Sequence, residues 1–193
     1  MKMKSLFLIL LMFSLVGCPI PESDRFEINS FKAEITTING MYELSEKKSI
    51  KWEDFAIQLS FKTKEVYALH SVGLGKTCYA ARSAEPELRN KILKATIQAS
   101  SKYNDILQRS NLDEILIPKV AGLERSISLT EACEFMASSS YSNSNNDEFY
   151  HGGYFRLTQS PNSDFTGKFY ISLEFEDGSI LQDSTQTVTI TSK

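Results

Sequence analysis

The feature that most constrains the fold is a strict alternation of apolar and polar residues near the end of the chain. Apolar residues recur at every second position of this stretch, and they are Phe169, Ile171, Leu173 and Phe175. In a β-strand successive side chains point to opposite faces, so this period predicts a strand with one buried face. Asp177-Gly178 follows directly, and this dipeptide favours the tight turn of a β-hairpin.

The same alternation recurs in shorter segments along the chain. Strands are predicted at residues 26–28, 31–35, 55–61, 93–99, 154–158 and 188–190. At residues 29–30 the phase of the alternation shifts, as an inserted bulge residue would cause. Residues 87–99 also fit a helix, but the β-branched Thr96 and Ile97 favour a strand. Several short strands separated by turn signals predict an all-β fold, namely an immunoglobulin-like β-sandwich.

The longest connection between the predicted strands carries the helical signals. Ser128 and Glu131 have the spacing of a capping box, which predicts a short helix near residues 129–137. Residues 112–117 suit a further helical turn or two. Residues 138–147 are almost wholly Ser and Asn, which is typical of a surface loop. The sandwich is therefore expected to hold one or two short helices in this connection.

The start of the chain has the pattern of an export signal. Lys2 and Lys4 precede an apolar run without charge that extends from Ser5 to Val16. A helix that spans a bilayer needs about 20 apolar residues. The shorter run therefore predicts a signal peptide that is removed.

The residues at the end of this run, Leu15-Val16-Gly17-Cys18, resemble the bacterial lipobox. The resemblance implies a diacylglyceryl group on the sulfur of Cys18, cleavage before it and acylation of the new amino group. Two or three acyl chains hold a protein on a membrane almost irreversibly. The alternative is an ordinary secretory signal with a chance cysteine. The expected organisation is a signal peptide at 1–17, a lipidated tether at 18–25 and a single β-sandwich domain at 26–193.

The charge balance makes nucleic acid an unexpected partner. The chain has 21 Lys and Arg and 24 Asp and Glu, a formal net charge of −3. Loss of Lys2 and Lys4 with the signal peptide makes it more acidic. Binding to phosphate backbones needs clustered Lys and Arg, and the sequence has no basic stripe.

Two cysteines remain after Cys18, namely Cys78 and Cys133. In an oxidising envelope two such cysteines often pair, so they are a candidate disulfide. The alternative is two buried free thiols that behave as small hydrophobic residues.

Several motifs that suggest chemistry lack a necessary part. Gly75-Lys76-Thr77 matches the end of a phosphate-binding loop, but His70 stands where that loop needs its first glycine, so no nucleotide is expected. His70 and His151 are the two histidines, and neither has the spacing of a metal site. A Cys/His nucleophilic pair is formally available, but no neighbouring residue would lower the thiol pKa. No catalytic residue, metal or cofactor is therefore predicted.

Acidic pairs occur at three places in the sequence: Glu85/Glu87, Asp113/Glu114 and Asp147/Glu148. A glycosidase needs two carboxyl groups across a cleft, whereas pairs in loops are the ordinary solvated surface of an acidic protein. The oxygen-rich segment 143–148 lacks the residue order of a calcium loop, and leaves weak calcium binding as an alternative.

Aromatic residues outside the predicted strand cores are candidates for binding. The predicted loop and the strand after it contain Tyr141, Tyr150 and Tyr154, whose rings could stack on sugar faces or anchor a protein partner. Asp183-Ser184-Thr185 resembles the acceptor of Bacteroidota-type O-glycosylation, which makes Ser184 a candidate modification site.

The lipobox, the short tether, residues 52–59 and residues 169–178 together are similar to lipoproteins of comparable length in gut Bacteroidota that carry a domain of unknown function. The resemblance implies an envelope location and a sandwich fold, and no activity. Pro19 follows Cys18 where aspartate would retain a lipoprotein in the inner membrane. The outer membrane is therefore expected, with the cell surface left open.

Two classes of function follow. The first is a non-catalytic envelope lipoprotein that binds a glycan or another envelope protein. The alternative is an envelope hydrolase, directed at glycans or peptides, with an unrecognised site. A deep pocket with convergent polar groups would favour the hydrolase. An exposed aromatic patch would favour the binding module.

Overall fold

The computed structural model describes residues 25–38, 49–66, 87–120, 123, 125–143 and 150–192. The predicted signal peptide, Cys18 and Cys78 lie outside these residues, as does His70 with the glycines after it. The predictions made for these residues therefore lie outside the part of the chain that the structure describes. Within the described ranges, no helix is long and apolar enough to cross a membrane.

The described chain is mostly β-structure, with one α-helix and three sheets. The large sheet has the order β4-β1-β3-β7-β6, formed by Glu87–Leu88, Arg25–Thr37, Phe55–Val66, Tyr150–Leu157 and Leu116–Val120. The hairpin sheet has the order β10-β9-β5, formed by Ile180–Ser184, Phe169–Phe175 and Ile92–Ala99. The small sheet has the order β2-β11-β8, formed by Ser49–Lys51, Val188–Thr191 and Phe165–Gly167.

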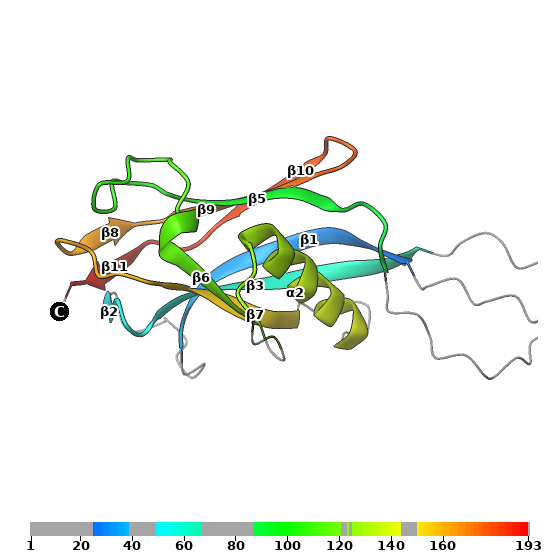
Figure 1. Ribbon diagram of the computed structural model, residues 1–193, viewed down its shortest axis with the longest axis horizontal. Helices are drawn as coiled ribbons and strands as arrows, with labels where there is room; N and C mark the ends of the chain where they lie inside the picture. The colour runs from blue at the N-terminus through cyan, green and yellow to red at the C-terminus, as the bar shows by residue number, and fades with distance from the viewer. Residues whose placement is uncertain are drawn as a thin grey trace, which may run out of the picture.

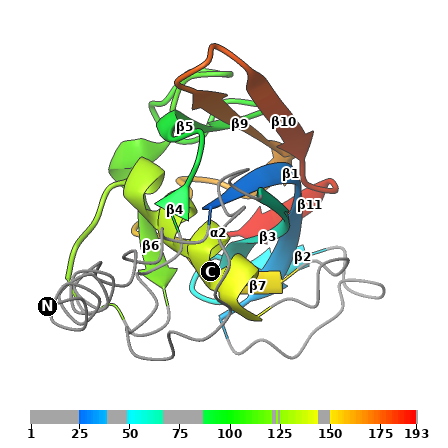
Figure 2. The same cartoon turned by 90° about the vertical axis from the view of Figure 1, so that its right-hand side faces the viewer.

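The large sheet curls into a half-barrel, and helix α2 (Leu129–Asn143) lies in its concave side (Figures 1 and 2). The helix contacts β3, β7 and β6 of that sheet and β5 of the hairpin sheet. The prediction of a mostly β fold is confirmed, but an immunoglobulin-like sandwich is not shown. In that sandwich two sheets face each other directly, whereas here a helix fills the hollow of the curled sheet.

Strands with long alternation were predicted well. Strand β1 pairs with β3 antiparallel, and the register shifts between Ile28 and Ser30, which confirms the bulge at residues 29–30. The hairpin of β9 and β10 turns at Gly178, whose φ of 81° suits glycine. In β5 the register shifts between Ile92 and Lys94, so Leu93 is exposed instead of belonging to the buried row.

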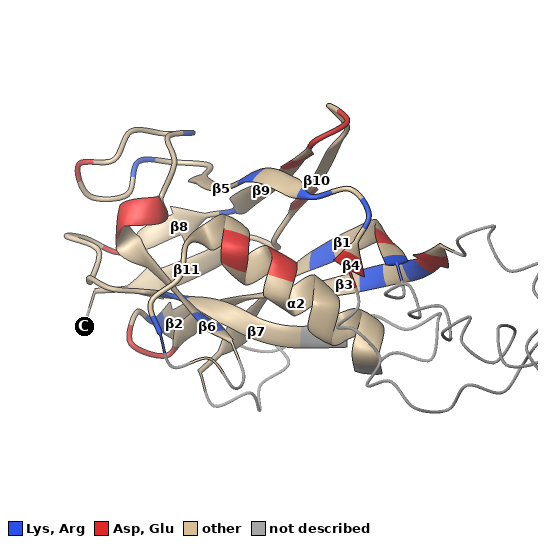
Figure 3. Ribbon diagram, turned by 45° about the vertical axis from the view of Figure 1, so that its right-hand side comes forward, with Lys and Arg blue, Asp and Glu red and all other residues tan. Residues whose placement is uncertain are grey.

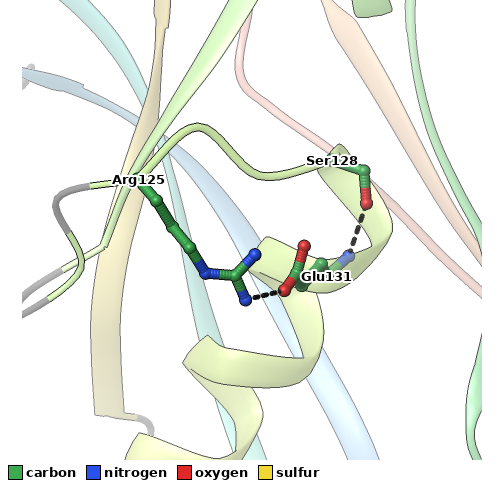
Figure 4. Close-up of polar contacts among 3 residues, drawn as sticks. All are labelled: Arg125, Ser128 and Glu131. Atoms are coloured by element: carbon green, nitrogen blue, oxygen red, sulfur yellow. Dashed lines mark hydrogen bonds and ion pairs between the residues drawn. The ribbon is translucent and has the colours of Figure 1, made fainter.

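Helix α2 begins with half of the predicted capping box (Figure 4). Ser128 Oγ accepts a hydrogen bond from the backbone N–H of Glu131 at 3.1 Å. The Glu131 carboxylate pairs with Arg125 instead of returning to the cap. The residues that face the core recur every three or four positions and are Leu129, Ala132, Cys133, Met136, Ala137 and Ser140. Such spacing buries one side of the helix.

The helix is longer than predicted, because residues 138–143 continue it instead of forming a loop. Ser and Asn are weak helix formers, but here a tertiary contact compensates. The buried Ser140 hydroxyl donates to the carbonyl oxygen of Phe61 on β3 at 2.7 Å. Phe135 is 39% exposed and does not belong to the buried side of the helix.

A glycine pair lets the helix approach the sheet closely. Between Gln58 and Ser60 the pairing of β3 with β7 shifts register, so that Leu59 lies opposite both Gly152 and Gly153. A Cβ on Gly152 would lie 3.1 Å from the Cα of Met136 on the helix. A Cβ on Gly153 would lie 2.4 Å from the carbonyl oxygen of Lys119. Glycine is required at this bulge because no side chain fits between these backbones.

Side chains from the helix and a loop satisfy the free edge of β5. Glu134 Oε1 accepts from Ile92 N–H at 3.2 Å, and Thr130 Oγ1 accepts from Ala95 N–H at 3.1 Å. Asn111 Oδ1 accepts from Ile97 N–H at 3.4 Å. The bonds from Glu134 and Thr130 tie the helix to the hairpin sheet.

The segment before the helix was predicted only in part. Residues 112–117 hold a single 3-10 turn, η1 (Asp113–Ile115), and the chain then continues as strand β6. Pro118 lies within this strand, which is tolerated because β6 is at the edge of the large sheet.

Candidate functional site

The outer face of the hairpin sheet carries three rows of side chains that run across its strands. The first row is Ile180, Glu174 and Lys94, the second is Gln182, Ser172 and Thr96, and the third is Ser184, Tyr170 and Gln98. The intervening residues of β9, such as Phe169 and Ile171, are buried on the inner face. The alternation that makes the core therefore places a polar surface on the other side of the same strand.

Arg109 lies over this surface from the loop that follows β5. Its guanidinium carbon is 4.9 Å from the centre of the Tyr170 ring, a cation–π contact. Among the described residues, Arg109 has no ion pair and no side-chain hydrogen bond. Its donor edges are therefore available to a ligand.

The backbone around Arg109 is held firmly in an unusual conformation. Arg109 has a φ of 59°, in the left-handed region, which costs a residue with a side chain about 1–2 kcal/mol. Its N–H donates to the carbonyl oxygen of Ala99 at 3.0 Å, and Gln108 Nε2 donates to that of Ser100 at 2.7 Å. Leu112 N–H donates to Ile97 at 2.9 Å. Such strain persists only where surrounding contacts impose it, and it is commonest at functional sites.

The second and third rows and Arg109 border a shallow hollow of about 390 Å³. Its lining includes Thr96, Gln98, Tyr170, Ser172, Gln182 and Ser184. Hydroxyl and amide groups both donate and accept hydrogen bonds, while the tyrosine ring offers an apolar surface. This combination suits a ligand that has many hydroxyl groups and apolar ring faces.

A second hollow, of about 470 Å³, lies where β1 begins, beside the β9–β10 turn. Its polar groups already bind one another. Arg89 pairs with Glu27 at 2.9 Å, and Asn90 Oδ1 accepts from Asp177 N–H at 3.2 Å. Hydrogen bonding from Ser179 lowers the pKa of the Asp177 carboxyl below its usual range. These contacts stabilise the turn and leave fewer groups for a ligand than the first hollow has.

The structure separates the tyrosines that were predicted to bind. The Tyr141 ring lies on helix α2 and stacks on Phe26 of β1, with centroids 4.8 Å apart and planes 11° apart. Tyr154 lies on β7, paired with Gln58 and Lys119 in a half-exposed row on the convex face of the large sheet. Tyr150 begins β7, and its side chain lies outside the described part of the chain. Tyr141 and Tyr154 therefore do not share a surface.

The predicted glycosylation motif lies at the end of strand β10, and its outer two residues have structural roles. Asp183 Oδ2 accepts from Ala33 N–H of β1 at 2.8 Å, which joins the hairpin sheet to the large sheet. Thr185 is 1% exposed, and its hydroxyl accepts from Phe169 N–H at 3.0 Å. Ser184 borders the first hollow, beside Tyr170. Modification of Ser184 stays a prediction.

Cys133 is buried on the core-facing side of α2 and has no disulfide partner among the described residues. Burial raises its pKa far above the usual thiol range, which makes it a poor nucleophile. Cys78 lies outside the described residues, so their pairing stays a prediction, which the mass of the non-reduced protein tests directly.

Burial also raises the pKa of two carboxyl groups near the helix, Glu134 and Asp113. Glu134 accepts from Ile92, and Asp113 accepts from Asn111 Nδ2 at 2.5 Å. Both therefore have structural partners. In the described ranges no three His, Cys, Asp or Glu residues form a group that could hold a metal ion.

Figure 3 shows Lys and Arg interspersed with Asp and Glu along the described strands and loops, whereas the charged residues of helix α2 are both acidic, Glu131 and Glu134. No protein-family model, curated protein or solved structure matches the chain. The site therefore rests on geometry. From the sequence, Tyr170 and Gln98 could be placed only on the polar faces of predicted strands. No sequence signal pointed to Arg109.

Proposed function

We propose that this protein is a non-catalytic envelope lipoprotein that binds a glycan on the outer face of its hairpin sheet. The observation that carries the proposal is the Arg109–Tyr170 pair, 4.9 Å apart, above rows of hydroxyl and amide groups in a hollow of about 390 Å³. Sugars present hydroxyl groups at their edges and C–H groups on their ring faces. The site offers a matching group for each.

The rigidity of the site also supports binding. The strands fix Tyr170 and Gln98 in register, and the bonded loop fixes Arg109. A site that is already ordered loses little conformational entropy when its ligand arrives. Shallow sites of this kind suit an extended chain of sugars that lies across the strands.

Affinity electrophoresis through soluble polysaccharides tests the proposal. The panel contains galactan, arabinan, and galacturonan with and without methyl esters. We expect Tyr170→Ala to reduce retardation in at least one gel, while Tyr154→Ala on the large sheet leaves it unchanged. If Tyr154→Ala reduces retardation and Tyr170→Ala does not, the binding site lies on the large sheet instead of the hairpin sheet. Turnover of any of these polysaccharides would favour the hydrolase instead.

The anchor is a separate part of the proposal. Cys18→Ala should give an unprocessed or soluble protein that no longer partitions into detergent with membrane proteins. A processed Cys18→Ala protein that still fractionates with membranes would contradict lipidation at Cys18. Protease treatment of intact cells then distinguishes the cell surface from the periplasmic face of the outer membrane.

A further inference from the structure

We infer that the glycan bound on the hairpin sheet carries a carboxylate, as a uronic acid does, and that Arg109 selects it. This inference rests on the proposed function, because it names the class of sugar that the same hollow would take. Its starting point is that Arg109 is exposed and has no acidic partner among the described residues. The other arginine beside a hollow, Arg89, already pairs with Glu27 at 2.9 Å.

The orientation of Arg109 suits a planar anion. A guanidinium that stacks on a ring uses its face, and its N–H groups remain free around its edge. A carboxylate can accept two parallel hydrogen bonds from that edge, a geometry that lysine cannot reproduce. Tyr170 lies beneath the guanidinium, with Arg109 Cζ 4.9 Å from its ring centre, and contributes an apolar surface beside it.

The charges around the hollow favour an anion with a single negative charge. Asp183 also borders the hollow, but its carboxylate accepts from Ala33 N–H of β1 at 2.8 Å and is held toward that strand. Glu174 lies one row beyond Ser172, with Lys94 beside it in the same row. One unpaired arginine therefore faces the ligand, in a protein with a net charge of −3. A uronate contributes one charge per sugar, whereas a phosphate monoester would contribute nearly two.

The decisive experiment compares de-esterified and fully methyl-esterified galacturonan oligosaccharides, which differ in their carboxylates. Binding to the full-length protein is measured by calorimetry. We expect the de-esterified form to bind at least tenfold more tightly, with an affinity that falls as salt rises. Arg109→Gln should remove most of that preference, and Arg109→Lys should restore only part of it. Lys119→Gln, which removes a positive charge from exposed β6 of the large sheet, is the matched control and should change nothing.

The outcomes separate the two proposals. Equal binding of both forms, lost with Tyr170→Ala, would overturn the uronate inference and leave glycan binding intact. A tenfold preference that survives Arg109→Gln would overturn the role of Arg109. Tighter binding of a sulfated chain such as chondroitin sulfate than of galacturonan would overturn the carboxylate assignment. Binding of neither form, with no retardation by any polysaccharide of the panel, would overturn both proposals.

Discussion

The concave side of the large sheet and the outer face of the hairpin sheet arise from the same alternating pattern and end with opposite chemistry. In the first, helix α2 covers the apolar row of β3, and even its buried hydroxyl, Ser140, has a backbone partner. In the second, the polar row of β9 stays open, and among the described residues Arg109 contacts an aromatic ring and no acidic group. The difference teaches that one face of a strand stabilises the fold while the other stays open, and it is on this open face that we propose a ligand binds.

The sharpest test of this comparison uses two neighbouring residues of β9. Phe169 is fully buried, with ring centroids 5.2 Å from Phe55 and 5.4 Å from Phe165. Phe169→Ala should lower the free energy of unfolding by about 3–5 kcal/mol. Tyr170→Ala should lower it by less than about 1 kcal/mol, as at an ordinary surface position, while reducing glycan binding. Urea denaturation of both variants measures the contrast, and equal losses would refute the division of the strand into two roles.

A substitution at the glycine bulge should disrupt the close packing of helix α2 on the large sheet. Gly153→Ala places a methyl group 2.4 Å from the carbonyl oxygen of Lys119, so the backbones must separate, at a cost of about 1–3 kcal/mol. Gly178→Asn is the control, because its surroundings are open and asparagine tolerates a φ of 81°. If Gly153→Ala unfolds at the same urea concentration as the wild type, the bulge is not the close approach described above.

The polar contact inside the concave side gives a smaller effect. Ser140→Ala removes the hydrogen bond to Phe61, and should lower the free energy of unfolding by about 1 kcal/mol. Ser142 is exposed on the same helix, and Ser142→Ala should be neutral or slightly stabilising, since alanine is the better helix former. Urea denaturation of the two serine variants compares them, and a larger loss with Ser142→Ala would contradict the buried role of Ser140.

The smallest effect is the pH dependence at the junction of helix and hairpin sheet. Burial raises the pKa of Glu134 above its ordinary value of about 4.3. The folded state therefore favours the protonated form, and this contribution to stability is lost as pH rises through the folded pKa. Glu134→Gln keeps an acceptor for Ile92 N–H and should be more stable than the wild type at neutral pH, by less than about 1 kcal/mol because Glu134 is half-exposed. Thermal midpoints at pH 4 and pH 7 check this, and a Glu134→Gln protein that is less stable at pH 7 would contradict it.

Long alternating segments were predictable because burial of one face imposes a period of two. That is why β1, β3 and β9 were found, and why the bulge near Ser30 was visible as a change of phase. The short strands β2, β4 and β8 were not found, since two or three residues carry no period and depend on their partners. The extension of α2 to Asn143 depends on the bond from Ser140 to Phe61, which no local propensity reveals.

The candidate site was less predictable than the fold. Arg109 and Tyr170 lie far apart in the sequence, and the pairing of β5 with β9 and a folded-back loop bring them together. The tyrosines that were predicted to bind show the opposite case, in which residues close in the sequence are separated by the fold. Tyr141 and Tyr154 are close in sequence, but a helix directs one toward Phe26 and a strand directs the other to the convex face.

The side chains along the free edge of β5 have a consequence beyond the fold. Glu134, Thr130 and Asn111 occupy the N–H groups of Ile92, Ala95 and Ile97. An exposed edge with these groups unpaired would be a template on which a second molecule could add a strand and begin to aggregate. At the edge of the large sheet, Pro118 gives β6 one N–H fewer to offer an incoming strand. The chain thus protects these two edges, β5 and β6, against strand addition by different means.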